Sequence, residues 1–246
     1  MSVMSEPANR PRSGSFYAIC GKRLFDILLS AGGLLVFALP MACVSVLILL
    51  ASGAPVFFRQ ERIGQHGKRF RICKFRTMTN HPLNGSTVTV AGDARLTTVG
   101  SWLRRLKVDE FPQLANVLRG NMSFVGPRPD VPGYADRLIG GDARLLELRP
   151  GITGPATVVF RDEEILLSRA RDPFRFNDEV LYPAKVRINL DYLNRISFCE
   201  DVKLILLTMS PMHLRHPERE RVVQALKAAS GNATGLPSTS ASGLGS

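Results

Sequence analysis

The feature that most constrains this chain is a stretch of 32 residues without a charged side chain, from Ile27 to Phe58. Its first 24 residues, to Leu50, are almost continuously apolar. A helix needs about 20 apolar residues to cross the hydrocarbon core of a bilayer, so the stretch is long enough to do so. Its length, and the lack of a small-x-small cleavage site after it, argue against a cleaved signal peptide. We therefore expect the chain to associate with a membrane through this segment.

Pro40 lies near the middle of the stretch, where it removes a backbone donor and its ring clashes with the preceding turn. Each half alone is too short for a full span at about 1.5 Å per residue. Basic residues flank the stretch on both sides: Lys22, Arg23, Arg59 and Arg62. This pattern favours both ends on the cytoplasmic side, as in a helix that bends at Pro40 and leaves by the leaflet it entered. A single-pass helix with a mild kink is the alternative, because true spans tolerate proline.

The remainder of the chain has room for one compact domain. Residues 1–15 are polar and contain Pro and Ser, which predicts a disordered N-terminus. Residues 230–246 are mostly Gly, Ser, Thr and Ala, which predicts a flexible tail. With a membrane-associated helix assigned to residues 16–58, residues 59–229 form the predicted domain.

Within that domain the patterns are mixed and mainly helical. Partial alternation over Arg69–Arg76 predicts a short strand with basic residues on one side. Apolar spacing predicts a helix over Thr98–Leu106 and one or two amphipathic helices over Val186–Met209. The expected fold class is therefore α+β, mainly helical, rather than a doubly wound sheet.

The charge balance indicates an anionic partner. Lys and Arg number 32 against 21 Asp and Glu, a formal net charge of +11. Nucleic acid, an acidic membrane surface and a phosphorylated substrate all fit such a charge. The single Trp gives no sign of a stacking platform for single-stranded nucleic acid. The four cysteines stand far apart, which supports neither a disulfide framework nor a zinc site and indicates a reducing compartment.

Asp109 and Glu110 are the first candidates for chemistry. Asp109 is expected to be the N-cap of a helix over Glu110–Leu118, with Gly120 as its stop. There the helix dipole would keep the carboxylate ionised, as a nucleophile must be, and would suit a phosphoryl group carried on it. Glu110 is then a candidate general base or ligand of a divalent cation. An ordinary N-cap with an acidic first turn is the alternative.

The second candidate is Arg128, which lies between Pro127 and Pro129. The prolines stiffen this loop, and a preorganised guanidinium suits bidentate recognition of phosphate. A rigid surface connection with a solvated arginine explains the same pattern. Further basic residues, which are either solvated or part of a diphosphate site, are Lys74, Arg76 and Arg104.

Taken in order, these stretches resemble the bacterial sugar transferase family, the small monotopic polyprenyl-phosphate phosphoglycosyl transferases. The matching motifs are KRLFD (22–26), RQERIG (59–64), KFRTM (74–78), DARLTTVGSWLRR (93–105), DEFPQLANVLRGNMSFVGPRP (109–129), RPGITG (149–154) and DYLNRISFCEDVKLILLT (191–208). Several long motifs in a fixed order are far more specific than any one of them. The resemblance covers nearly everything outside the two tails.

The resemblance implies transfer of a phospho-sugar from a UDP-sugar to polyprenyl (undecaprenyl) phosphate, which releases UMP and initiates assembly of an exopolysaccharide, capsule or other glycan. It implies that Asp109 attacks the phosphorus attached to the sugar and forms a covalent intermediate. Glu110 would be its partner for Mg²⁺ or for activating the lipid phosphate. Arg104 and Arg128 match family arginines expected to neutralise the diphosphate and position the nucleotide. Residues assigned with them to phosphate or nucleotide binding are Lys74, Arg76 and Pro127.

The resemblance also implies a membrane helix that is re-entrant at Pro40, with the catalytic domain on the cytoplasmic face of the bacterial inner membrane. One position departs from the pattern: Leu39 precedes the proline, where family members often have Ser. The expected partners are the UDP-sugar, polyprenyl phosphate and membrane lipid, with no nucleic acid, and a homo-oligomer is left open.

A membrane-anchored basic binding protein is the competing class of function, with the net charge serving nucleic acid or anionic lipid. Such modules need dispersed Lys and Arg. Here Asp109 and Glu110 lie among arginines and near a Pro-Arg-Pro loop, which favours a phosphoryl-transfer site.

Overall fold

The computed structural model describes residues 17–79, 96–210 and 215–231. The predicted N-terminal tail and nearly all of the predicted C-terminal tail lie outside these residues. The elements are η1 (Tyr17–Gly21), α1 (Lys22–Val36), α2 (Ala38–Ser52), β1 (Phe57–Ile63), η2 (Gln65–Gly67), β2 (Arg69–Phe75), α3 (Thr98–Arg105), η3 (Val108–Gln113), α4 (Leu114–Leu118), β3 (Ser123–Val125), η4 (Ala135–Arg137), η5 (Gly140–Glu147), β4 (Gly151–Thr153), α5 (Pro155–Val159), α6 (Glu163–Ser168), α7 (Pro173–Phe176), η6 (Asn177–Leu181), α8 (Tyr182–Leu193), α9 (Phe198–Met209) and α10 (Pro217–Gly231). The prediction of a mainly helical α+β fold is confirmed.

The apolar stretch forms two helices, α1 and α2, bent by 59° relative to each other. The bend was expected at Pro40. The break between the helices is instead at Phe37, three residues earlier in the chain. Pro40 occupies the third position of α2, in the first turn, where a backbone N–H has no intrahelical partner. In the described part of the chain no single helix is long and apolar enough to cross a membrane. The two helices of the bent pair, taken together, have the length and composition that a membrane segment requires.

The first turns of α1 are attached to the rest of the protein by polar contacts. Lys22 forms an ion pair of 2.6 Å with the fully buried Asp201 of α9. Arg23 donates hydrogen bonds to the carbonyls of Val117 and Leu118 at the end of α4. The two basic residues that flank the apolar stretch on its N-terminal side are thus engaged with protein groups.

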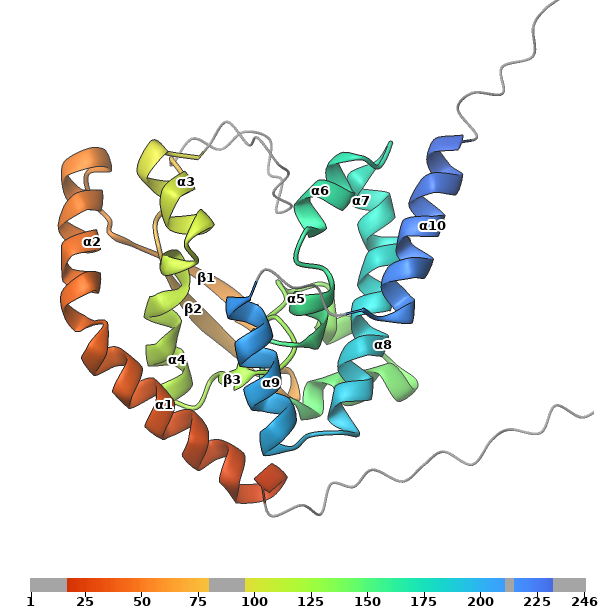
Figure 1. Ribbon diagram of the computed structural model, residues 1–246, viewed down its shortest axis with the longest axis horizontal. Helices are drawn as coiled ribbons and strands as arrows, with labels where there is room; N and C mark the ends of the chain where they lie inside the picture. The colour runs from red at the N-terminus through yellow and green to blue at the C-terminus, as the bar shows by residue number, and fades with distance from the viewer. Residues whose placement is uncertain (1–16, 80–95, 211–214, 232–246) are drawn as a thin grey trace, which may run out of the picture.

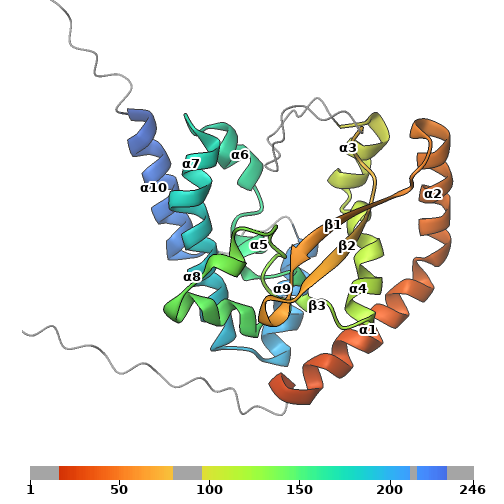
Figure 2. The ribbon, with the colours of Figure 1, turned by 180° about the vertical axis from the view of Figure 1, so that it is seen from behind.

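Further along the bent pair, large apolar side chains are exposed. On α1 and the start of α2 they include Leu28, Leu35, Val36 and Leu39, which are 64–81% exposed. Figures 1 and 2 show α1 and α2 along one side of the molecule, opposite α10. An apolar surface of this extent is typical of a membrane or protein contact.

Two small sheets lie within the described part of the domain. β1 and β2 form an antiparallel hairpin in which Phe57 lies opposite Phe75 and Ile63 opposite Arg69, which confirms the strand predicted there. β3 and β4 form a short parallel pair. The helices predicted over Thr98–Leu106 and Val186–Met209 are present as α3 and as the pair α8 and α9.

Contacts between α2 and the hairpin join the bent pair to the domain. Ile48 of α2 packs against Phe75 of β2 and Leu103 of α3, and all three side chains are buried. Arg76, directly after β2, donates hydrogen bonds to the carbonyls of Ser52, Gly53 and Ala54 at the end of α2. Cationic donors suit this position, because the last carbonyls of a helix lack intrahelical partners.

Replacing Arg76 with Leu is expected to weaken this joint without affecting recognition of a phosphorylated ligand. The loss of charge-assisted hydrogen bonds should lower the free energy of unfolding by about 2 kcal/mol. Thermal unfolding in detergent would measure this loss. A large rise in the KM of a phosphorylated substrate, with an unchanged free energy of unfolding, would instead support the assignment of Arg76 to phosphate binding.

Candidate active site

Asp109 and Glu110 lie in the first turn of η3, a 3₁₀ helix that continues into α4. The expectation of a single helix with Asp109 as its N-cap is therefore wrong. Lys107, at a left-handed φ of 58°, is the residue before η3, and neither it nor Asp109 caps the helix through its side chain. Both carboxylates are buried, at 7% and 8% exposure. Gly120 ends the segment at a φ of +88°, so the predicted stop is confirmed.

Glu110 is held by two cations from different parts of the chain. Its Oε1 lies 2.8 Å from Nζ of Lys74, on β2, and 2.8 Å from Nη2 of Arg128, in the loop after β3. The side chains of Glu110 and Lys74 are largely buried, whereas that of Arg128 is 48% exposed. The fold thus brings together three of the residues that the sequence singled out, and leaves the guanidinium accessible.

The loop that carries Arg128 is fixed on both sides. Pro127 and Pro129 are buried; the carbonyl of Pro127 accepts a hydrogen bond from the backbone of Gly151, and that of Pro129 accepts one from Nη1 of Arg62 at 3.0 Å. Pro127 therefore acts here as a buried support. Sequence reasoning used Arg62 only as a flanking charge; its place in the RQERIG motif was the signal for this role.

Arg104 reaches the site from α3. Its Nε donates to Oγ1 of Thr77 at 3.0 Å. The helix lies directly against the residues after β2, because a Cβ at Gly100 would come within 2.0 Å of the Thr77 carbonyl oxygen. Gly100 therefore permits the close approach that brings Arg104 to Thr77, and the charge of Arg104 lowers the pKa of Asp109.

The environment of Asp109 differs from that expected at a helix N-cap. Burial raises the pKa of its carboxyl above the usual 3.8, and the charge of Glu110 adds to the rise. Lys74, Arg104 and Lys107 oppose this shift. No hydrogen bond reaches the Asp109 carboxylate from the residues that the structure describes. The Asp109 carboxylate is thus influenced by three cations but has no hydrogen-bond donor among the described residues.

The pKa values of Lys74 and Glu110 are shifted in the opposite direction to that of Asp109. Burial lowers the pKa of Lys74 to about 8, with Arg128 adding to the effect and Glu110 opposing it. Burial disfavours the charged form of Glu110, but Arg128 and Lys74 outweigh it and hold the pKa of Glu110 well below its usual range. Two adjacent carboxylates with pKa values moved in opposite directions can take different chemical roles.

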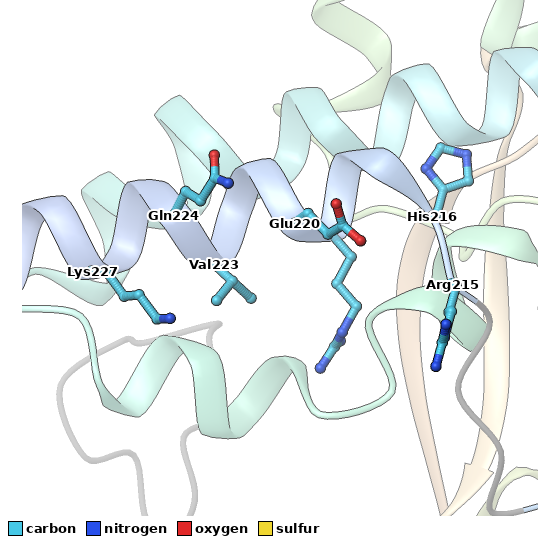
Figure 3. A pocket seen from close by; sticks show the side chains of 7 residues that line it. Arg215, His216, Glu220, Val223, Gln224 and Lys227 are labelled. Carbon is cyan, nitrogen blue, oxygen red and sulfur yellow. The ribbon is translucent and has the colours of Figure 1, made fainter.

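The side chain of Arg76 and a hollow along α10 are not part of the group formed by Glu110, Lys74 and Arg128. Arg76 is bound to carbonyls at the end of α2, so the structure does not bring it to the carboxylates. A hollow of about 420 Å³ along α10 is lined by Arg215, Lys227 and neighbours (Figure 3) and contains none of the predicted site residues. The hollow at Arg128 itself has a volume of about 20 Å³, room for about one water molecule.

The oxygen donors of the site match the requirements of Mg²⁺. In the described ranges, no group of three or more His, Cys, Asp or Glu side chains could enclose a metal ion. Mg²⁺ is usually bound by one or two carboxylates together with waters and substrate phosphates, so a site with Asp109 and Glu110 as protein ligands would fit that pattern. Both ion pairs of Glu110 use its Oε1, so neither of them occupies Oε2, the other oxygen that could face a metal ion.

Comparisons with known proteins show the family of this chain. Residues 17–215 match the model of the bacterial sugar transferase family. The chain belongs to this family. The matched region includes the bent helix pair, the hairpin, η3 and the loop of Arg128, so every residue of the site lies within it.

Individual relatives cover different lengths. The uncharacterized sugar transferase EpsL of Bacillus subtilis is 36% identical over 195 residues, which are 76% of this chain and 85% of EpsL. The UDP-glucose:undecaprenyl-phosphate glucose-1-phosphate transferase of Xanthomonas campestris is 37% identical over 78% of this chain and 38% of its own length. The enzyme of that name from Escherichia coli is 36% identical over 76% of this chain and 39% of its own. The chain thus spans well under half of these two relatives.

Replacing Lys74 with Met should move the acid limb of the pH profile of transferase turnover upward. A nucleophilic Asp109 would have to be deprotonated, and Lys74 lowers the pKa of Asp109, so removing this cation raises that pKa further. Turnover measured from pH 4 to 9 in roughly half-unit steps would show the shift. Lys203→Met, at an exposed ion pair on α9, is the control. An acid limb that stays in place or moves down would contradict this account of Asp109.

Proposed function

We propose that this protein transfers a sugar 1-phosphate from a UDP-sugar to polyprenyl phosphate, producing a polyprenyl diphosphate sugar and UMP. The observation that carries the proposal is the buried Asp109 carboxylate, which has cationic neighbours but no hydrogen-bond donor in the described residues, next to a Glu110 fixed by Lys74 and Arg128. The names of the relatives from Xanthomonas and Escherichia, which specify undecaprenyl phosphate and glucose 1-phosphate, support the substrate classes.

The reaction consists of two displacements at one phosphorus. An oxygen of Asp109 attacks the phosphorus attached to the sugar, the bond to the bridging oxygen breaks, and UMP leaves with its electron pair. An oxygen of polyprenyl phosphate then attacks the same phosphorus, and the bond to Asp109 breaks, which regenerates the carboxylate. Two steps through a covalent intermediate let one small site handle two bulky phosphates in turn.

The cations around the carboxylates offset the charges that oppose attack. An anionic nucleophile is repelled by a diphosphate, so the site needs positive charge where negative charge develops. The half-exposed Arg128 is available to the donor phosphates, and the charge of Arg104 favours the ionised form of Asp109. Lys74 is buried against Glu110 and fixes it. Mg²⁺ held by Asp109 and Glu110 would supply further charge neutralisation of the diphosphate.

Membrane association through the bent pair completes the proposal. Both flanks of α1 and α2 connect to the same domain, through Lys22 at one end and Arg76 at the other. This supports a re-entrant segment, with the domain on the cytoplasmic face of the inner membrane, over a single pass. The acceptor phosphate would then remain at headgroup level, close to the carboxylates, while its tail lies in lipid.

Asp109→Asn is expected to abolish release of UMP from a UDP-sugar and to leave membrane association intact. An amide is not a nucleophile at phosphorus under these conditions, so the first displacement stops. Enzyme incubated with donor alone and digested for mass spectrometry should carry the added phospho-sugar on Asp109. Asp191→Asn, at an exposed position of α8, should behave as wild type. Normal turnover by the Asp109 variant would rule out this nucleophile.

Cysteine labelling would test the re-entrant arrangement. In a chain whose other cysteines are replaced by Ser, the exposed Cys20 reports on the flank before α1 and Lys68→Cys on the turn after β1. We expect both to resist a membrane-impermeant maleimide in spheroplasts and both to react in inverted vesicles. Reaction of the two flanks from opposite sides would mean a single pass.

A further inference from the structure

Asn116, in α4, has a buried carboxamide with both polar ends bonded to one strand. It is 2% exposed. Its Nδ2 donates to the backbone carbonyl of Arg71 at 2.8 Å, and its Oδ1 accepts from the backbone N–H of Cys73 at 3.1 Å. Both groups belong to β2, so the side chain joins the helix that follows the carboxylates to the strand that carries Lys74.

These two bonds occupy the edge of β2 that β1 leaves free. On the other edge, Arg71 and Cys73 lie opposite Glu61 and Arg59 of β1. In a strand the C=O of one residue and the N–H of the residue two positions later point to the same side, so one carboxamide can bond both, as the N–H and C=O of one residue in a parallel third strand would. A pair of hydrogen bonds of this kind fixes the position of α4 along β2 as well as the distance between the helix and the strand.

The fixed position matters because the acidic pair is on the same helical run. Glu110 precedes Asn116 by six residues in the continuous segment of η3 and α4, a rise of about 10 Å. Lys74 directly follows Cys73 on β2. The 2.8 Å ion pair between Lys74 and Glu110 therefore joins the same two elements that the Asn116 carboxamide joins.

We propose that Asn116 is a positioning residue, whose carboxamide sets the register of η3 and α4 against β2 and so places Asp109 and Glu110 for phosphoryl transfer. This inference rests on the proposed function for its kinetic consequence, but the placement of Glu110 against Lys74 can be tested without catalysis. Without the carboxamide, the backbone groups of Arg71 and Cys73 lose their partners, and nothing else in the described contacts ties α4 to this edge by two hydrogen bonds.

The first experiment compares Asn116→Leu with Asn189→Leu. Asn189 is a buried asparagine on α8, 5% exposed, whose Oδ1 has no hydrogen-bond partner in the described residues, so its replacement controls for putting an apolar side chain in place of a buried amide. A displacement of about 1 Å at the reacting atoms costs on the order of 100-fold in rate. We expect the Asn116 variant to lose about that much kcat for UDP-sugar and undecaprenyl phosphate, with KM changed by less than about threefold. The Asn189 variant should retain kcat.

The second experiment measures the rate at which a small, amine-reactive acetylating reagent modifies Lys74, and mass spectrometry detects the product. Lys185 is the internal control, because its ion pair with Glu163 and its exposure of 21% resemble those of Lys74, which is 17% exposed. We expect Asn116→Leu to speed acetylation of Lys74 several-fold and leave Lys185 unchanged. General loosening of the fold would speed both reactions, and equal labelling of Lys74 in variant and wild type would likewise overturn the proposal.

The two experiments separate the possible failures. If wild type transfers no sugar phosphate, the proposed function fails, and the labelling result alone decides the role of Asn116. If Asn116→Leu does not fold, Asn116→Asp keeps the acceptor for the Cys73 N–H and loses only the donor, and should give an intermediate effect on Lys74 labelling. Wild-type kcat in a folded Asn116 variant whose Lys74 is more reactive would show that this contact does not position the site.

Discussion

The ion pairs of Glu110 with Lys74 and Arg128 are the interaction on which the arrangement of this site depends. Each partner comes from a different element: a helical turn, a strand and a proline-bounded loop. A largely buried carboxylate is unfavourable without such partners, so the three elements are stable together only when all are in place. The same grouping leaves Asp109, the next residue along the chain, with no hydrogen-bond donor among the described residues, so these contacts do not engage its oxygens in the nucleophilic role proposed for it.

The β1–β2 hairpin serves as the template for this grouping. Its second strand provides Lys74 and bonds Asn116, and the end of its first strand holds the loop of Arg128 through Arg62. The residue after the hairpin, Arg76, holds the end of α2. The apolar helices and the acidic pair are therefore attached at the same end of the hairpin, through the consecutive residues Lys74, Phe75 and Arg76.

The sequence predicted those parts of the structure that depend on local pattern, and missed those that depend on where an element ends. The apolar run, the strand over Arg69–Arg76 and the stiff Pro-Arg-Pro loop follow from composition and spacing. Alternation along a strand would place Lys74 and Arg76 on the same side, but β2 ends at Phe75, so alternation no longer governs Arg76. The helix predicted to begin at Asp109 is a 3₁₀ turn preceded by Lys107 in the left-handed region, which no periodicity indicates. The role of Arg62 depends on a loop 67 residues away in the chain.

The guanidinium of Arg76 at the end of α2 has a consequence for how the protein meets its lipid environment. This tether and the ion pair of Lys22 hold both ends of the bent pair to the folded domain. In the proposed re-entrant arrangement, protein geometry would therefore set the immersion depth of the helices in their leaflet, and with it the height of the carboxylates above the hydrocarbon.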